Sequence, residues 1–237
     1  MPDSDNHVGL TPIHAGTMPY PEAMVLQQRL HARAVASDGV NYLLFVEHPA
    51  VLTLGKHADL AHLSLDREGY LAQGVELVQA DRGGEVTAHM PGQMVVYPII
   101  RLSSYRLSPK RYVAGLEEAV IRLLAGYGIE AQRDPEFPGV WVGREKICAV
   151  GIRIKQRVAM HGIALNVAND LTLFSQIVPC GISGRGVTSM GRLLKCSIDL
   201  DSLRRKFAEE FLALLCASQG TTCIRAPLQW LEGLSTI

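Results

Sequence analysis

Cys180 is the residue whose type and setting best suit covalent chemistry. It stands between Pro179 and Gly181. Proline fixes its own φ and glycine permits unusual φ and a close backbone approach, so a sharp turn of this composition exposes a sulfur. At neutral pH only a small fraction of an ordinary thiol is the nucleophilic thiolate. A Pro-Cys-Gly turn is equally compatible with a purely structural role, and both interpretations stay open on the residues alone.

A reactive thiol needs a nearby cation, and Lys146 is one candidate for it. This lysine follows the Gly143-Arg144 turn and opens the strand-like segment 147–154, so its amine could project from a strand end into a cleft. The alternative is a solvated lysine at a sheet edge. His89 and His161 are further candidates, either as bases or as histidines with a structural hydrogen-bonding role.

Other kinds of site find no support in the sequence. It contains no HExxH and no zinc-type ligand spacing, so we expect no metal. It lacks the phosphate-binding GxxxxGK[ST] pattern, and residues 184–189 only approach GxGxxG. Residues 181–185 fail the GxSxG pattern because Arg185 replaces the second glycine.

Composition indicates a packed globular protein without a strong overall field. The 237 residues are 48% hydrophobic and 19% charged, with 23 basic and 23 acidic side chains. We therefore expect no nucleic-acid partner and no membrane association. The N-terminus lacks the basic and apolar regions of a secretory signal, and the apolar runs are too short to span a bilayer, which favours a cytoplasmic location. Five cysteines without a CxxC pair favour reduced thiols, and Cys148 and Cys216 have the setting of small buried apolar residues.

Hydrophobic periodicity predicts helices and strands that must position these groups. Proline at the first turn and apolar spacing predict a helix over 21–37, and Ser108-Pro109 predicts another that ends near Gly126 or Gly128. A third is predicted over 201–218 and a short one over 65–71. Strands are predicted at 40–46, 51–54, 75–80 and 94–100, and an antiparallel meander over 140–167. These elements predict an α+β fold with mixed or antiparallel sheets flanked by helices. We expect them to form one domain, residues 1–237, with a small C-terminal appendage over 200–237 as an option.

Five sequence blocks occur in an order that closely resembles the lipoyl(octanoyl) transferases. They are HPAVLTLGK (48–56), RGGEVTAHMPGQMVVYPI (82–99), GVWVGREKICAVGIRI (139–154), HGIALNV (161–167) and PCGI with VTS (179–189). Five motifs in a shared order are far more specific than any one of them. The resemblance covers most of residues 40–190.

The resemblance implies an acyltransferase that uses a Cys-bound thioester and no cofactor. The donor would be octanoyl-acyl carrier protein. The acceptor would be a lysine of a lipoyl domain, as in the 2-oxoacid dehydrogenase complexes, or of the glycine cleavage H protein. The motif cysteine corresponds to Cys180 and the motif lysine to Lys146. The fold would be the one shared with the catalytic module of biotin and lipoate protein ligases.

The resemblance also implies which residues line the acyl site, in three segments of the chain. They are Arg82, Gly83, Gly84, Glu85, Val86, Thr87, Ala88 and His89 from the first, Ala149, Val150 and Gly151 from the second, and Gly162, Ile163 and Ala164 from the third. Two positions depart from the family pattern. Ala88 stands where the family usually has a tyrosine. Met90 stands where the family usually has a glycine, and methionine adopts positive φ less easily than glycine. Both bear on the backbone of this loop and on the acyl-chain length.

Two rival functions are compatible with the same fold. One is an ATP-dependent lipoate or biotin protein ligase, against which the motif cysteine argues. The other is a non-catalytic module that binds a carrier protein, in which Cys180 would be dispensable. Carrier proteins and lipoyl domains are typically acidic, so basic residues in segments 101–111 and 144–157 are candidate docking groups.

Overall fold

The computed structural model describes residues 9–37, 39–178, 184–218 and 231–232, the last two as backbone only. Cys180 therefore lies outside the described residues. The predicted elements are present in the expected order. None of the helices in the described part of the chain is long and apolar enough to cross a membrane.

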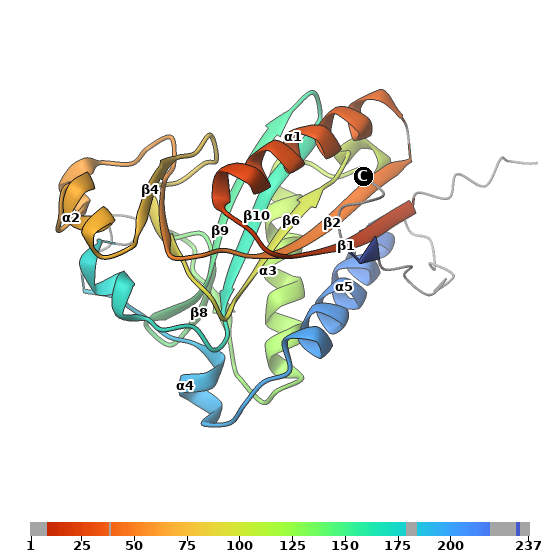
Figure 1. Ribbon diagram of the computed structural model, residues 1–237. Helices are drawn as coiled ribbons and strands as arrows, with labels where there is room; N and C mark the ends of the chain where they lie inside the picture. Colours follow the sequence, from red (N-terminus) through yellow and green to blue (C-terminus); the bar gives the residue numbers. More distant parts are fainter. Residues whose placement is uncertain (1–8, 38, 179–183, 219–230, 233–237) are drawn as a thin grey trace, which may run out of the picture.

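A nine-stranded mixed sheet forms the centre of the molecule (Figure 1). Its strands, in spatial order, are β12 (Leu231–Glu232), β1 (Gly9–Thr17), β2 (Val40–Glu47), β6 (Gln93–Ile99), β10 (Val158–Asn166), β9 (Glu145–Lys155), β8 (Val140–Val142) and β7 (Gln132–Arg133). β11 (Gly186–Val187) pairs with β9 in parallel. β1 is parallel to both its neighbours, whereas β8, β9 and β10 form the predicted antiparallel meander. The predicted fold class is confirmed.

Helices cover both faces of this sheet because its strands are apolar on both sides. Along β2, Leu43 and Phe45 belong to one buried cluster and Leu44 and Val46 to another, as alternation in a strand requires. α1 (Tyr20–Ala36) packs on the second cluster. α3 (Pro109–Ala125) and α5 (Leu200–Ala217) pack together on the first (Figure 1).

A smaller sheet stands beside the first and holds part of the predicted acyl site. It has the order β4 (Glu76–Gln79), β3 (Val51–Leu54), β5 (Val86–His89). The helix α2 (Arg67–Ala72) and the short 3-10 helices η1 (Leu60–His62) and η3 (Thr172–Gln176) belong to the same region. Two further short helices, η2 (Leu102–Tyr105) and α4 (Met190–Leu194), lie in connections.

The state of one cysteine differs from the expectation of reduced thiols. Cys148 and Cys196 are free, but Cys216, near the end of α5, is disulfide-bonded. Cys148 is fully buried as predicted. An odd number of cysteines leaves room for a pair, and sequence spacing alone does not reveal which sulfurs the fold brings together.

Candidate active site

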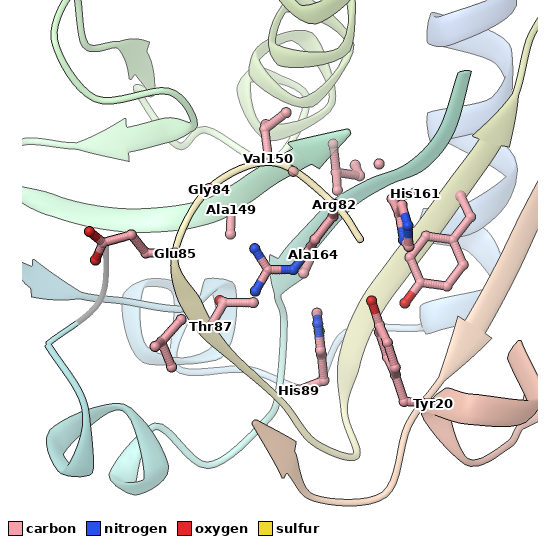
Figure 2. A pocket seen from close by; sticks show the side chains of 15 residues that line it. Tyr20, Arg82, Gly84, Glu85, Thr87, His89, Ala149, Val150, His161 and Ala164 are labelled. Atoms are coloured by element: carbon pink, nitrogen blue, oxygen red, sulfur yellow. The ribbon is translucent and has the colours of Figure 1, made fainter. Parts of the chain in front are cut away.

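A pocket opens between the β9–β10 pair and the segment that connects β4 to β5 (Figure 2). Twelve of the fourteen residues that the resemblance assigns to the acyl site line it: Arg82, Gly84, Glu85, Val86, Thr87, His89, Ala149, Val150, Gly151, Gly162, Ile163 and Ala164. Gly83 and Ala88 are not among the lining residues. Tyr20, Tyr97 and His161 complete the wall. The fold thus brings the three predicted segments together around one cavity.

The loop that carries Arg82 is fixed across β9 by a backbone hydrogen bond. The amide of Gly83 donates to the carbonyl oxygen of Ile152 at 2.9 Å. Gly151 makes this approach possible, because a Cβ there would stand 3.2 Å from both Arg82 Cδ and the Gly83 carbonyl oxygen. Gly83 therefore serves the pocket through its backbone position.

Arg82 is 7% exposed and its guanidinium reaches into the pocket (Figure 2). Nη2 donates to the Thr53 carbonyl oxygen at 2.6 Å and to Thr53 Oγ1 at 2.8 Å, and Nη1 donates to the Gly83 carbonyl oxygen at 3.0 Å. These acceptors fix the orientation of the guanidinium. The pocket therefore contains an oriented, buried positive charge.

A chain of buried polar side chains continues from Arg82 to the segment that follows β11. His89 lies 3.5 Å from Thr53 Oγ1 through Nε2 and 2.9 Å from Gln93 Oε1 through Nδ1. Gln93 Nε2 donates to Asn166 Oδ1 at 2.9 Å, and Asn166 Nδ2 donates to the Thr188 carbonyl oxygen at 3.1 Å. Because Gln93 Oε1 can only accept, Nδ1 of His89 is the protonated nitrogen. Burial, together with nearby His48, lowers the pKa of His89 well below its ordinary value, so the ring is neutral.

Aromatic and histidine side chains close the other end of the pocket. Burial raises the pKa of Tyr20 to about 12, although the Arg82 guanidinium acts in the opposite direction. Tyr20 stacks on His89 with ring centroids 5.7 Å apart. The hydroxyl of Tyr97 donates to His48 Nε2 at 2.8 Å, since His48 Nδ1 donates to the Met18 carbonyl oxygen. These contacts anchor the start of α1 to the pocket.

His161 stands at this end with an unusual backbone conformation. Its φ is +57° and its side chain is 1% exposed. Nε2 lies 2.6 Å from Asp81 Oδ1, and Asp81 also pairs with Arg153. Burial, reinforced by Arg82 and Arg153, lowers the pKa of His161 to about 3. The ring is therefore neutral and donates from Nε2 to the carboxylate.

Lys146 is buried at the beginning of β9, at 6% exposure. Its Nζ lies 4.8 Å from the centre of the Trp141 ring, a cation–π distance. The β8–β9 register shifts between Val140 and Trp141, and both Ile147 and Cys148 belong to the core on the α3–α5 side. This irregularity places Lys146 and Ala149 on the opposite side of β9. Ala149 lines the pocket, whereas Lys146 is not among its lining residues.

The two departures from the family pattern have separate consequences in the structure. Ala88 is fully buried in the cluster beneath the small sheet, with Leu52 and Phe174, and does not line the pocket. Met90 does not adopt positive φ, and its sulfur accepts from Asn169 Nδ2 at 3.0 Å. The turn uses Gly92 instead, with φ +84° and a backbone approach to Asn169 that a Cβ would block. Neither side chain forms part of the pocket wall.

Sequence reasoning did not identify Tyr20, Tyr97 or Trp141 as site residues. Trp141 and Tyr97 stand inside the quoted motifs, and that position in the sequence could have indicated that they belong to the site. Tyr20 belongs to a helix start remote in sequence from every motif, and only the tertiary fold brings it to the pocket. The position of Cys180 relative to Lys146 lies outside the described residues.

The fold and this pocket define an α+β domain with a partly apolar ligand pocket, and the comparisons identify its family. Residues 19–212 match the lipoyl protein ligase A/B catalytic domain. An octanoyltransferase of Chloroflexus aggregans is 46% identical over 211 residues, which cover 88% of this chain and 94% of that protein. The chain belongs to the lipoyl protein ligase A/B catalytic domain family.

Solved structures with much lower identity share the fold. A lipoate-protein ligase A bound with ATP has a TM-score of 0.65 at 16% identity, covering 96% of this chain and 90% of that one. P. falciparum LipL1 in complex with lipoate has a TM-score of 0.70 at 11% identity, covering 94% of this chain and 66% of that one. This chain thus spans about two thirds of that structure's length. These likenesses confirm the fold predicted from the motifs.

Proposed function

We propose that the chain transfers an octanoyl group from octanoyl-acyl carrier protein to a lysine of a lipoyl domain, through a thioester on Cys180. The observation that carries the proposal is the 46% identity to an octanoyltransferase over nearly the whole of both chains. The pocket supports it, because alanine, valine, isoleucine and glycine form much of the wall. Burying an eight-carbon chain there would contribute on the order of 5 kcal/mol, at about 0.8 kcal/mol per methylene.

The proposed reaction balances in two steps. The Cys180 thiolate attacks the carbonyl carbon of the donor thioester, and the new carbon–sulfur bond forms as the bond to the carrier sulfur breaks. Lys146 supplies a proton to the departing carrier thiolate. The acceptor lysine amine then attacks the acyl-enzyme, an amide forms, its extra proton passes to Lys146, and the Cys180 thiolate leaves. Exchange between two thioesters needs no ATP.

The proposed acceptors are lipoyl domains of the 2-oxoacid dehydrogenase complexes and the glycine cleavage H protein. An ATP-dependent ligase remains the alternative, because a lipoate-protein ligase A bound with ATP shares the fold. The sequence favours transfer, since it carries the motif cysteine and lacks a phosphate-loop pattern.

Intact-mass measurement separates these functions. The protein is incubated with octanoyl-acyl carrier protein, with and without ATP and magnesium. We expect one added octanoyl group without ATP and none in Cys180→Ser. Discharge to a lipoyl domain should then restore the original mass. Acylation of a lipoyl domain by free octanoate that requires ATP would instead establish a ligase, and no modification under any condition would favour a binding module.

A further inference from the structure

The deep end of the pocket contains polar atoms that the proposed transfer does not use. Nδ1 of His161 is buried and has no hydrogen-bond partner among the residues that the structure describes. Because Nε2 donates to Asp81, Nδ1 of the neutral ring is a bare acceptor. The Tyr20 hydroxyl is also buried, beside the Arg82 guanidinium, which acts on its pKa. Both side chains line the pocket (Figure 2).

The backbone of His161 is strained in a way that aims its ring at this end. Ile163, two residues further along β10, belongs to the core on the α3–α5 side. In a regular strand His161 would face the same way. Instead its positive φ turns the ring to the α1 side, where it contacts Tyr97 edge-on at 6.2 Å. This conformation is unfavourable for a residue other than glycine, and such strain concentrates at functional positions.

The strand register gives the length of the pocket between its two ends. Ala149 pairs with Ala164, and Ile152 pairs with His161. The two levels are three residues apart, or about 10 Å at 3.3 Å per residue. Lys146 lies beyond the Ala149 end, three residues before it. An extended eight-carbon chain spans about 9 Å, given carbon–carbon bonds of about 1.5 Å.

We propose that Tyr20 and His161 form a polar floor that ends the acyl site after eight carbons and thereby sets the chain length. The inference rests on the proposed function, which puts the reacting carbonyl at the Lys146 end. A ten-carbon chain would push its terminal methyl against the phenol and the bare imidazole nitrogen. It would place an apolar group against two polar ones and exclude the solvent that a buried acceptor such as Nδ1 of His161 normally binds.

The test compares chain lengths in wild type and in Tyr20→Phe, which removes one oxygen from the floor. Rates of acyl loading are measured with octanoyl- and decanoyl-acyl carrier protein. We expect the decanoyl-to-octanoyl ratio of kcat/KM to rise about tenfold or more, because one methylene in an apolar pocket changes this ratio by about 10- to 200-fold. Tyr112→Phe is the matched control, because Tyr112 is equally buried but lies in the α3 core. An unchanged ratio in Tyr20→Phe would overturn the inference.

Two further measurements keep the floor and the proposed function separable. His161→Asn, in which asparagine tolerates positive φ, should shift the ratio in the same direction and replaces Tyr20→Phe if that variant does not fold. Calorimetric binding of octanoate and decanoate needs no transfer activity. If the decanoate-to-octanoate binding ratio changes in the variants but the protein has no transfer activity, the polar floor is supported and the proposed transferase function is refuted. If this ratio is equal in wild type and variants, the polar floor is refuted.

Discussion

The Lys146 ammonium and the Arg185 guanidinium share one aromatic neighbour. Lys146 Nζ is 4.8 Å and Arg185 Cζ 4.9 Å from the centre of the Trp141 ring. Arg185 also pairs with Asp134, and Trp141 Nε1 donates to the Phe137 carbonyl oxygen at 3.1 Å. These contacts hold the indole of Trp141 against the segment that precedes β8. We infer that Trp141 is a positioning residue for the proposed catalytic lysine.

Removing the aromatic face should slow acyl loading more than it alters donor binding. A buried cation–π contact contributes roughly 0.5–2 kcal/mol, so Trp141→Leu should reduce single-turnover loading about twofold to thirtyfold. Trp141→Phe, which keeps a π face, should retain most of the rate. Circular dichroism of both variants controls for folding. Equal rates in the leucine and phenylalanine variants would show that the indole serves packing alone.

At the scale of elements, the packing of the β8–β9 hairpin requires glycine at position 139 more strictly than at position 143. Gly139 has φ +127°, and a Cβ there would stand 2.6 Å from the Cys148 carbonyl oxygen and 3.3 Å from Lys146 Cε. Gly143, in the same hairpin, has φ +58° and no atom within 4 Å of its Cβ position. The first glycine permits close packing, whereas the second only permits a turn.

Alanine at these two glycines should therefore have unequal effects. Gly143→Ala meets only the left-handed backbone penalty, about 1–2 kcal/mol. Gly139→Ala adds an overpacking cost of about 1–3 kcal/mol and displaces Lys146. Thermal unfolding should show the larger fall in Tm for Gly139→Ala, and loading should slow only in that variant. Similar losses of stability and rate in both would contradict the packing argument.

Three buried histidines on elements around the pocket predict a pH dependence of stability. Desolvation lowers the pKa of His48 to about 4, against a weaker opposing effect of the Met18 carbonyl. It lowers the pKa of His161 to about 3 and that of His89 well below its ordinary value. In the unfolded chain such groups titrate near pH 6.5. Below that pH the unfolded state binds protons that the folded state does not, so the free energy of unfolding falls as pH is lowered.

Urea unfolding between pH 7 and 5 measures this slope, above the range in which most carboxylates titrate. Three such groups give at most about 4 kcal/mol per pH unit, at 1.36 kcal/mol for each proton. His48→Gln should remove about one proton from the slope. A free energy of unfolding that stays constant from pH 7 to 5 would mean that these rings take up protons without unfolding.

The elements that sequence predicted well are those whose signals are local. Ser108 caps α3 through a hydrogen bond from the Arg111 amide, and Pro109 with the apolar spacing fixed the start of that helix. β1 was missed because Pro12 and polar residues weaken its pattern, and its pairing with β2 is long-range. The motifs predicted which segments meet at the pocket. They could not predict the direction of the His161 ring, because a positive φ at a non-glycine residue is imposed by tertiary contacts.

Across the whole molecule, basic residues lie near both ends of β9, and those at the Lys146 end include Arg192, which sequence analysis did not name as a docking residue. From Lys146 to Lys155 the strand covers nine residue steps, about 30 Å. Segment 101–106 lies at the Lys155 end, since the Leu102 amide donates to the Arg157 carbonyl oxygen and Arg101 bridges Val158. At the Lys146 end stand Arg144, two residues before the lysine, and Arg192, whose Nη1 is 3.6 Å from Glu145 Oε1.

An acidic carrier protein that delivers its thioester to Lys146 should contact the basic residues at the Lys146 end. We expect Arg144→Glu combined with Arg192→Glu to raise the apparent KM for octanoyl-acyl carrier protein about fivefold to tenfold at low salt, because rim charges act mainly on association. The matched pair, Arg106→Glu with Arg111→Glu, should have a smaller effect. Both effects should shrink as salt shortens the screening length from about 30 Å at 0.01 M to about 8 Å at 0.15 M. A larger effect from the Arg106–Arg111 pair would show that the carrier protein does not dock at the Lys146 end. An unchanged KM in both double variants at low salt would exclude electrostatic docking by either group.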